Sequence, residues 1–234
     1  MTKEIEFETY IRITSKIVGI YVFDKTKLQN LYFDEINYEI EKDNIDFEIL
    51  TKIIEGNVFK IEKLIGKFIN NVSLIIENKK ILNLNFCLKK KNYEKNLSIS
   101  YIKNMVTEAK DLFKENYQKQ KIMHIIIEKY LMDGNEHTKF INDLKCDNLC
   151  LEVKFISISN NLILEIEKIM ERYQIKIINF LDENYIRSVF KKNEIGLSLM
   201  AHKIHSGYNE NEVSIVPKNL KKKGFFEKFF QLFS

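Results

Sequence analysis

The sequence predicts an α+β fold, on three observations. Apolar and polar residues alternate near the N-terminus, which is the spacing of half-buried strands. Apolar residues recur every three to four positions in two later stretches, which is helical spacing. Beyond these stretches the patterns follow the order strand, helix, strand, strand, helix, strand, and such mixing of elements is typical of α+β domains.

The first half of the chain is expected to begin with strands between residues 5 and 40, broken by a turn over 24–27. Phe7, Thr9, Ile11 and Ile13 alternate with other residues along the first of these strands. Two helices are expected next, over residues 47–54 and 58–68, separated at Gly56 because glycine is a weak helix former. Residues 72–88 are expected to form a hairpin that turns at 78–80.

The second half begins with a helix whose N-cap would be Ser98 or Ser100 and whose apolar face runs from Ile102 to Phe113. The apolar run 122–131 predicts a buried strand, which ends at the turn signal Asp133-Gly134. The later patterns predict a strand over 149–158, a helix over 162–173, a strand over 175–181 and a helical segment over 183–206.

The composition is that of a globular protein, with 45% hydrophobic and 30% charged residues among 234. Its three cysteines are an odd number without the spacing of a disulfide framework, which predicts a reducing cytoplasm. The first ten residues lack the apolar core of a signal peptide. The apolar runs are far shorter than the ~20 residues that span a bilayer, so a soluble or peripheral protein is expected.

The excess positive charge lies in the C-terminal tail. Residues 218–234 contain five lysines and one glutamate, a net charge of +4, which equals the net charge of the whole chain. The remaining residues therefore carry 32 basic and 32 acidic side chains, from totals of 37 and 33. A nucleic-acid-binding fold would need a basic stripe on its body, so this class is disfavoured.

The tail is expected to form an amphipathic helix over residues 219–234. At 100° per residue, its apolar side chains cover an arc of about 160°; they are Phe225, Phe226, Phe229, Phe230, Leu232 and Phe233. Lys228 lies on the opposite side, and Lys221, Lys222 and Lys223 precede the helix. This composition is typical of an interfacial membrane anchor. Two other readings stay open: docking in a partner's groove, and packing on the chain's own domain.

The sequence signals for a catalytic or metal-binding site are weaker than the signal in the tail. Cys146 and Cys150 could supply half of a zinc site, and His202 with His205 the other half, but the pairs are far apart in the sequence. His124 lies within an apolar strand and reads as a hydrogen-bonded core histidine. The sequence shows no Gly-rich phosphate loop, nucleophile elbow or HExxH motif, so no enzyme activity, cofactor or metal is expected.

Residues 96–190 carry a family resemblance. A helix over 100–117 precedes HIIIEKYLMDG at 124–134, whose most specific part is Tyr130-x-x-Asp133-Gly134; the strand LCLEVKFISIS, a helix and the strand IKIINFL follow. This run resembles the inserted strand–helix–strand–strand (SHS2-type) domain of the FtsA family of actin-like bacterial cell-division proteins. The charged tail helix is similar to that family's C-terminus, and the segment 193–197 resembles the one that closes its actin-like core.

This chain departs from the family's phosphate-loop pattern. The family's Asp-Ile-Gly-Thr-Ser-Lys aligns with residues 11–16, which keep Thr14, Ser15 and Lys16 but have Ile11 for the aspartate and Ile13 for the glycine. The loss of Asp removes the carboxylate that organises Mg²⁺, and the loss of Gly prevents close approach of a phosphate. Most of the second actin-like half also has no counterpart in the sequence.

The resemblance implies a shortened, non-catalytic cell-division adaptor. Its expected parts are a partial actin-like subdomain (1–71), an inserted domain (72–182), a closing helix (183–207), a linker (208–218) and the membrane helix. It implies binding to anionic inner-membrane lipid on the cytoplasmic face at the division site. It also implies self-association and division-protein partners, with the tubulin-like ring protein FtsZ as one candidate. The alternatives are an ATP-binding enzyme and a soluble interaction module whose tail docks on a partner protein.

Overall fold

The structure is a computed structural model that describes residues 6–38, 45–92, 97–141, 145–190 and 195–213. It contains two sheets and helices, which confirms the α+β class. The chain forms two compact units, and each is described by itself. The first unit comprises residues 1–81 and 160–206, and the second comprises 82–159 and 207–234. The second unit is thus inserted into the first between two of its strands.

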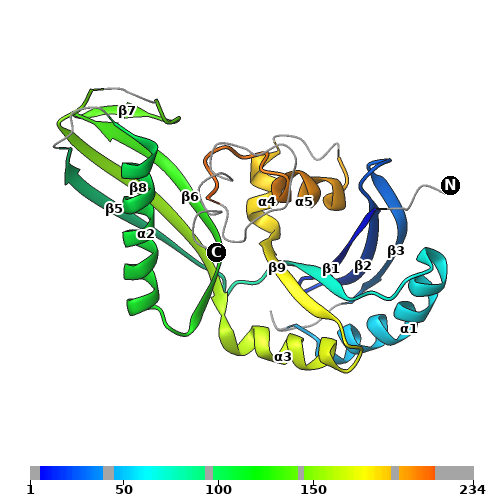
Figure 1. The fold of residues 1–234 in the computed structure, drawn as a ribbon. Helices are drawn as coiled ribbons and strands as arrows, with labels where there is room; N and C mark the ends of the chain where they lie inside the picture. The colour runs from blue at the N-terminus through cyan, green and yellow to red at the C-terminus, as the bar shows by residue number, and fades with distance from the viewer. Residues whose placement is uncertain (1–5, 39–44, 93–96, 142–144, 191–194, 214–234) are drawn as a thin grey trace. The chain divides into compact units, whose positions relative to one another are not determined.

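The first unit is built on a five-stranded sheet in the order β3-β2-β1-β4-β9. β1 (Phe7–Ile13), β2 (Ile17–Asp24) and β3 (Gln29–Asn37) form an antiparallel meander, as the alternation predicts. β4 (Asn71–Ile76) pairs in parallel with β1, and β9 (Lys176–Asp182) pairs in parallel with β4. Figure 1 shows α1 and α3 on one side of this sheet and α4 and α5 on the other.

Two helices of the first unit, α1 and α4, begin at aspartate side chains that cap them. α1 (Phe47–Ile65) begins where the Asp46 side chain accepts hydrogen bonds from two backbone N–H groups, and it ends at Gly66 with φ 69°. α3 (Asn160–Glu171) precedes β9. α4 (Glu183–Val189) is capped by Asp182, and α5 (Leu197–His205) begins after Gly196.

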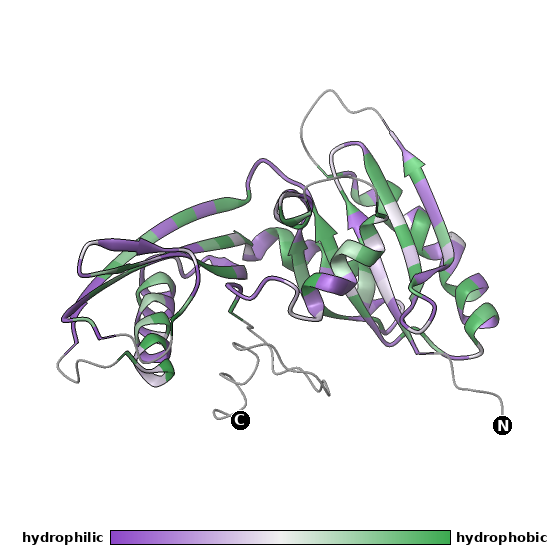
Figure 2. Cartoon of the chain, turned by 90° about the horizontal axis from the view of Figure 1, so that it is seen from above, coloured by the Kyte–Doolittle hydropathy of each residue, from purple (hydrophilic) through white to green (hydrophobic). Residues whose placement is uncertain are grey.

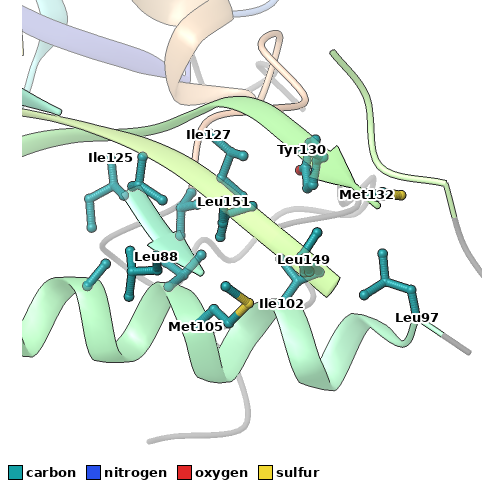
Figure 3. Close-up of a cluster of buried hydrophobic side chains, with 14 of the residues drawn as sticks. Leu88, Leu97, Ile102, Met105, Ile125, Ile127, Tyr130, Met132, Leu149 and Leu151 are labelled. Atoms are coloured by element: carbon teal, nitrogen blue, oxygen red, sulfur yellow. The ribbon is translucent and has the colours of Figure 1, made fainter. Parts of the chain in front are cut away.

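The second unit is a four-stranded antiparallel sheet in the order β5-β8-β6-β7. Its strands are β5 (Leu82–Lys91), β6 (Gln120–Met132), β7 (Asn135–His137) and β8 (Asn148–Ser159). α2 (Ile99–Asn116) is capped by Ser98, one of the two predicted serines, and packs its apolar side on the sheet. Figure 3 shows this core, where Leu88, Ile102 and Met105 meet residues of β6 and β8. The strands alternate between hydrophobic and hydrophilic residues along their length (Figure 2).

The predicted Asp133-Gly134 turn is confirmed, and it joins β6 to β7. Both residues have positive φ angles, 48° and 87°, and Met132 pairs directly with Asn135 across the turn. A two-residue hairpin turn needs such left-handed conformations, which Asp and Gly tolerate. The Asp133 carboxylate also accepts hydrogen bonds from the backbone N–H groups of Asp147 and Asn148, at 3.0 and 2.7 Å. These bonds lower the pKa of Asp133.

Two local predictions in the first half are wrong. α1 runs unbroken through Gly56, which lies on its exposed side, because the cost of about 1 kcal/mol for a helical glycine is small beside the burial of Leu50, Ile53 and Ile61. Residues 72–88 do not form a hairpin. The turn at 78–80 exists, but β4 pairs in the first sheet and β5 pairs with β8 in the second.

The domain boundaries also differ from those expected. The inserted unit covers 82–159 rather than 72–182, because β4, α3 and β9 complete the sheet of the first unit, which therefore extends past residue 71. The expected closing helix over 183–207 is divided into α4 and α5. The expected linker over 208–218 is partly structured, since residues 211–213 pair with β6. The expected membrane helix over 219–234 lies outside the described residues.

Candidate functional site

The β1–β2 turn holds the residues aligned with the family's phosphate loop. The backbone N–H of Thr14 donates to the Ile17 carbonyl at 2.9 Å. The Thr14 hydroxyl oxygen accepts from the N–H groups of Lys16 and Ile17, at 3.1 and 2.8 Å. Tyr38 closes the turn from outside, because its N–H donates to the Lys16 carbonyl and its hydroxyl to the Thr14 carbonyl.

This turn is poorly suited to bind a phosphate. A phosphate loop presents its backbone N–H groups to the ligand, and here the N–H groups of Thr14, Lys16 and Ile17 bond within the turn. The side chains of Ile11 and Ile13 are fully buried in the core of the first unit. Residues 11–16 thus span the end of β1 and the turn, with the two isoleucines packed inward.

A buried ion-pair cluster lies beside this turn. The Arg12 guanidinium donates two hydrogen bonds to the Glu183 carboxylate, from Nε at 2.8 Å and from Nη2 at 2.7 Å. Arg187 donates to the same carboxylate at 2.9 Å, four residues along α4. Glu35 contacts Arg12 Nη1 at 3.2 Å and accepts a hydrogen bond from the Tyr21 hydroxyl. The Glu183 side chain is only 2% exposed.

The sequence analysis missed this cluster, because Arg12 and Glu183 are 171 residues apart and belong to no motif. The pairing locks the N-terminus of α4 to β1. Burial works against the charge on Arg12, but the hydrogen bonds and charge of Glu183 raise the pKa of the guanidinium. Each charged group of the cluster has a charged partner within it.

A pocket of about 720 Å³ opens in the first unit near the start of β1, β4 and β9. Glu8 lines it, and the Glu8 carboxylate accepts from the Tyr10 hydroxyl at 2.5 Å and lies 2.8 Å from His202 Nδ1. Burial disfavours ionisation of Glu8, but these hydrogen bonds and the nearby histidines outweigh it and lower its pKa. The sequence analysis did not predict this pocket, although His205, which it named as a candidate zinc ligand, lines it.

The cysteines and histidines of the zinc site considered from the sequence lie in different units. Cys146 and Cys150 belong to the second unit, whereas His202 and His205 belong to the first. Within the described residues, no group of three or more His, Cys, Asp or Glu side chains could hold a metal ion. His124 is buried as expected, and its Nδ1 lies 2.7 Å from the Glu212 carboxylate.

The structure pairs two of the three cysteines, which their spacing in the sequence did not indicate. Cys87 on β5 and Cys150 on β8 form a disulfide, with their Cα atoms 6.5 Å apart. The two residues are 63 positions apart in the sequence, but they become diagonal neighbours because Lys89 pairs with Cys150. Their spacing along the chain therefore carried no information about pairing. Cys146 is free and buried.

The segment before the tail is fixed on the second unit. The N–H of Ile127 donates to the Asn211 carbonyl at 2.9 Å, and the N–H of Val213 donates to the Ile125 carbonyl at 2.8 Å. Glu212 bridges Ile126 in antiparallel fashion, and Val213 is 2% exposed within the core of this unit. Residues 211–213 thus have a defined position on the edge of β6.

The predicted membrane-binding residues, Lys221 to Phe233, lie outside the described residues, so their arrangement stays a prediction. No helix in the described part of the chain is long and apolar enough to cross a membrane.

The sequence matches no family profile and no curated protein. Among solved structures, it is similar to the cytoplasmic domain of EpsL, an inner-membrane component of the type II secretion system of Vibrio cholerae. The TM-score is 0.41 at 6% identity, over 77% of this chain and 59% of that chain. It is similar to the PilM–PilN type IV pilus biogenesis complex, with a TM-score of 0.46 at 4% identity, over 76% of this chain and 48% of that chain.

A third similar structure is a Bacteroides thetaiotaomicron protein of unknown function with an actin-like ATPase fold. Its TM-score is 0.34 at 15% identity, over 83% of this chain and 60% of that chain. The chain therefore spans between 48% and 60% of the length of these structures. All three TM-scores are below 0.5.

Proposed function

We propose that this protein is a non-catalytic adaptor held at a membrane surface by its tail. The observation that carries the proposal is the pattern of residues 219–234, in which five phenylalanines and one leucine share one side of the expected helix behind three lysines. The segment 211–213 supports it, because its position in the second unit gives the tail a firm attachment to a folded domain.

The β1–β2 turn supports the non-catalytic part of the proposal. The N–H groups of Thr14, Lys16 and Ile17 bond within the turn, and the buried Ile11 and Ile13 take the positions of the aspartate and glycine in the pattern that the chain resembles. Such a turn offers neither a cradle for phosphates nor a carboxylate for Mg²⁺. The buried pair of Arg12 and Glu183 beside it is already balanced in charge.

In its finer form, the proposal is that the protein is a shortened relative of FtsA that works at the bacterial division site. The first unit would be the partial actin-like subdomain, and the second would be the SHS2-type domain that contacts division proteins. Two features support this assignment. The second unit is inserted within the first, and its elements β5, α2, β6 and β8 follow the order strand, helix, strand, strand.

Vesicle co-sedimentation tests the membrane role. The full chain is expected to sediment with anionic vesicles, and a chain ended at Pro217 is expected to stay in the supernatant. This truncation retains Val213 and therefore the packed segment. Burying a Phe side chain contributes roughly 1.5–3 kcal/mol, less at an interface, so Phe226→Glu with Phe229→Glu should abolish binding. Replacing Lys221, Lys222 and Lys223 with Gln should weaken binding most at low salt.

A matched control comes from the first unit. Phe59 on α1 is 76% exposed, so Phe59→Glu should leave both the fold and vesicle binding unchanged. If the chain ended at Pro217 sediments as well as the full chain, the tail is not the anchor. If the full chain does not sediment with vesicles, a soluble module whose tail docks on a partner protein becomes the better description.

A further inference from the structure

The disulfide between Cys87 and Cys150 lies on the face of the second sheet that points away from its core. Successive residues of a strand point to opposite faces of a sheet. Cys87 follows this rule beside Leu88, and Cys150 lies between Leu149 and Leu151; all three leucines belong to the core that packs against α2 (Figure 3). Cys87 is exposed and Cys150 is partly exposed, so a dissolved thiol can reach the bond.

The two sulfur atoms have neighbours of opposite charge. Lys89 is the direct cross-strand partner of Cys150, and Glu152 is the direct cross-strand partner of Cys87. The Cβ atoms of such partners lie about 4.5–5.5 Å apart on the same face of the sheet. A positive charge beside Cys150 stabilises a thiolate there, and a negative charge beside Cys87 disfavours one. Cys150 is therefore the better leaving group when the disulfide opens.

The third cysteine is kept apart from this pair. Cys146 is free and lies within the core of the second unit, where the Asn92 amide donates to its sulfur at 3.9 Å. Burial raises the pKa of the Cys146 thiol. A buried thiol with a raised pKa reacts slowly. Exchange is therefore confined to the two cysteines on the opposite face of the sheet.

The disulfide joins an edge strand to a central strand. The second sheet has the order β5-β8-β6-β7, and in the described residues β5 pairs only with β8. An edge strand has hydrogen bonds to one neighbour only, so it opens more easily than a central strand. A cross-link between residues 63 positions apart restricts the unfolded chain and so favours the paired strands. Loss of the bond should therefore be felt first in β5.

We propose that Cys87 and Cys150 form a reversible site of exchange with a dithiol reductant, and that the redox state of this site sets how firmly β5 is held in the second sheet. One thiolate of the dithiol attacks the Cys87 sulfur, the disulfide breaks, and Cys150 leaves as a thiolate beside Lys89. The second thiol of the reductant, after losing its proton, attacks the reductant's own sulfur in the mixed disulfide and releases Cys87. Two electrons pass from the dithiol to the protein, the dithiol becomes a disulfide, and the two cysteines take up the two protons.

A dithiol fits this site better than a single thiol. The pairing of β5 with β8 holds Cys150 beside Cys87 after the first step. Cys150 can then attack the mixed disulfide and expel a single thiol, because the reaction takes place within one molecule. The second thiol of a dithiol has the same advantage and completes the reduction. This site goes beyond the membrane role of the tail and does not depend on it.

Alkylation of the full chain followed by peptide mass mapping tests the chemistry. Dithiothreitol should make Cys87 and Cys150 reactive in the folded chain, while Cys146 should stay unmodified until urea is added. Reduced glutathione at the same thiol concentration should reduce the bond far less, and the mixed disulfide trapped by rapid alkylation should lie on Cys87. Reduction of the pair only in urea would overturn the proposal. Equal reduction by glutathione would overturn the choice of a dithiol.

Hydrogen exchange tests the effect on the fold. Reduction should speed exchange at the amides of β5 and leave those of β1 and β2 in the first unit unchanged. Cys87→Ser with Cys150→Ser should show the same fast exchange at β5, with or without dithiothreitol. Protection of β5 that is equal in both redox states would overturn the proposed role of the bond.

Matched charge variants test the assignment of the leaving group. Lys89→Glu should slow the reduction severalfold, because the Cys150 thiolate then leaves beside a negative charge. Lys119 is exposed in the turn between α2 and β6, so Lys119→Glu makes the same change elsewhere in the second unit and should leave the rate unchanged. Equal rates for both variants would overturn the role of Lys89. Vesicle binding should be the same in both redox states, so failure of this proposal and failure of the membrane role are separate results.

Discussion

Glu183→Gln is expected to destabilise the first unit strongly while keeping the size of the side chain. Glu183 is 2% exposed and its carboxylate receives hydrogen bonds from both Arg12 and Arg187. Glutamine removes the negative charge, so Arg187 faces a neutral amide and Arg12 keeps only its 3.2 Å contact with Glu35. The Arg187 side chain is 36% exposed and can be hydrated, but that of Arg12 is only 13% exposed. Breaking a buried pair costs about 3–5 kcal/mol, and the exposure of Arg187 favours the lower end.

Urea unfolding followed by circular dichroism measures this loss. A loss of about 3 kcal/mol corresponds to a lower Tm by roughly 6–12 °C for a chain of this size. Arg187→Gln should lower the free energy of unfolding by about 1 kcal/mol or less, because Glu183 still pairs with Arg12. Arg12→Met combined with Glu183→Leu should recover part of the loss of Glu183→Gln, because no charge then stays buried alone. If Glu183→Gln costs no more than Arg187→Gln, the cluster does not depend on a buried carboxylate.

Two further predictions concern the β1–β2 turn and Glu8. Calorimetry with Mg-ATP should show no heat of binding, since the N–H groups of Thr14, Lys16 and Ile17 bond within the turn; a micromolar dissociation constant would contradict this. The pKa of Glu8 is lowered in the folded state, so its contribution to stability is present above its usual pKa of 4.5 and is lost as the pH falls through the lower value. Unfolding measured across this acid range should therefore depend less on pH in Glu8→Gln, and an unchanged acid profile would count against the role of Glu8.

Local patterns in the sequence predicted much of the fold. The alternation at β1, the cap at Ser98 and the Asp133-Gly134 turn each depend on neighbouring residues, and each was found as expected. Strand partners were not predictable in the same way. The pattern of β4 shows that it is a buried strand, but its neighbours β1 and β9 are chosen by packing between distant segments.

The candidate sites differ in the same way: features set by single residues could be predicted from the sequence, and pairings between distant residues could not. The prediction that the chain lacks phosphate chemistry rests on Ile11 and Ile13, because the aspartate and glycine of the pattern it resembles have specific chemical roles. The sequence could not predict two pairings, Arg12 with Glu183 and Cys87 with Cys150, because each arises only when the sheets form. The segment 211–213 looked like a linker because it is polar, yet its backbone bonds to β6 do not depend on apolar side chains.

The segment 211–213 gives a final prediction about how the tail is attached. Val213 is 2% exposed in the core of the second unit, and burying such a side chain contributes about 1.5–3 kcal/mol. Glu212 adds its contact with His124, and the backbone adds two hydrogen bonds to β6. A chain ended at Ser206 should therefore unfold at lower urea concentration than one ended at Pro217, and Val213→Asp in the full chain should reproduce much of the loss. The chain ended at Pro217 should be as stable as the full chain, because it keeps every one of these contacts. Equal stability of the two truncated chains would show that the segment is a linker after all, and that the tail is attached through a flexible connection.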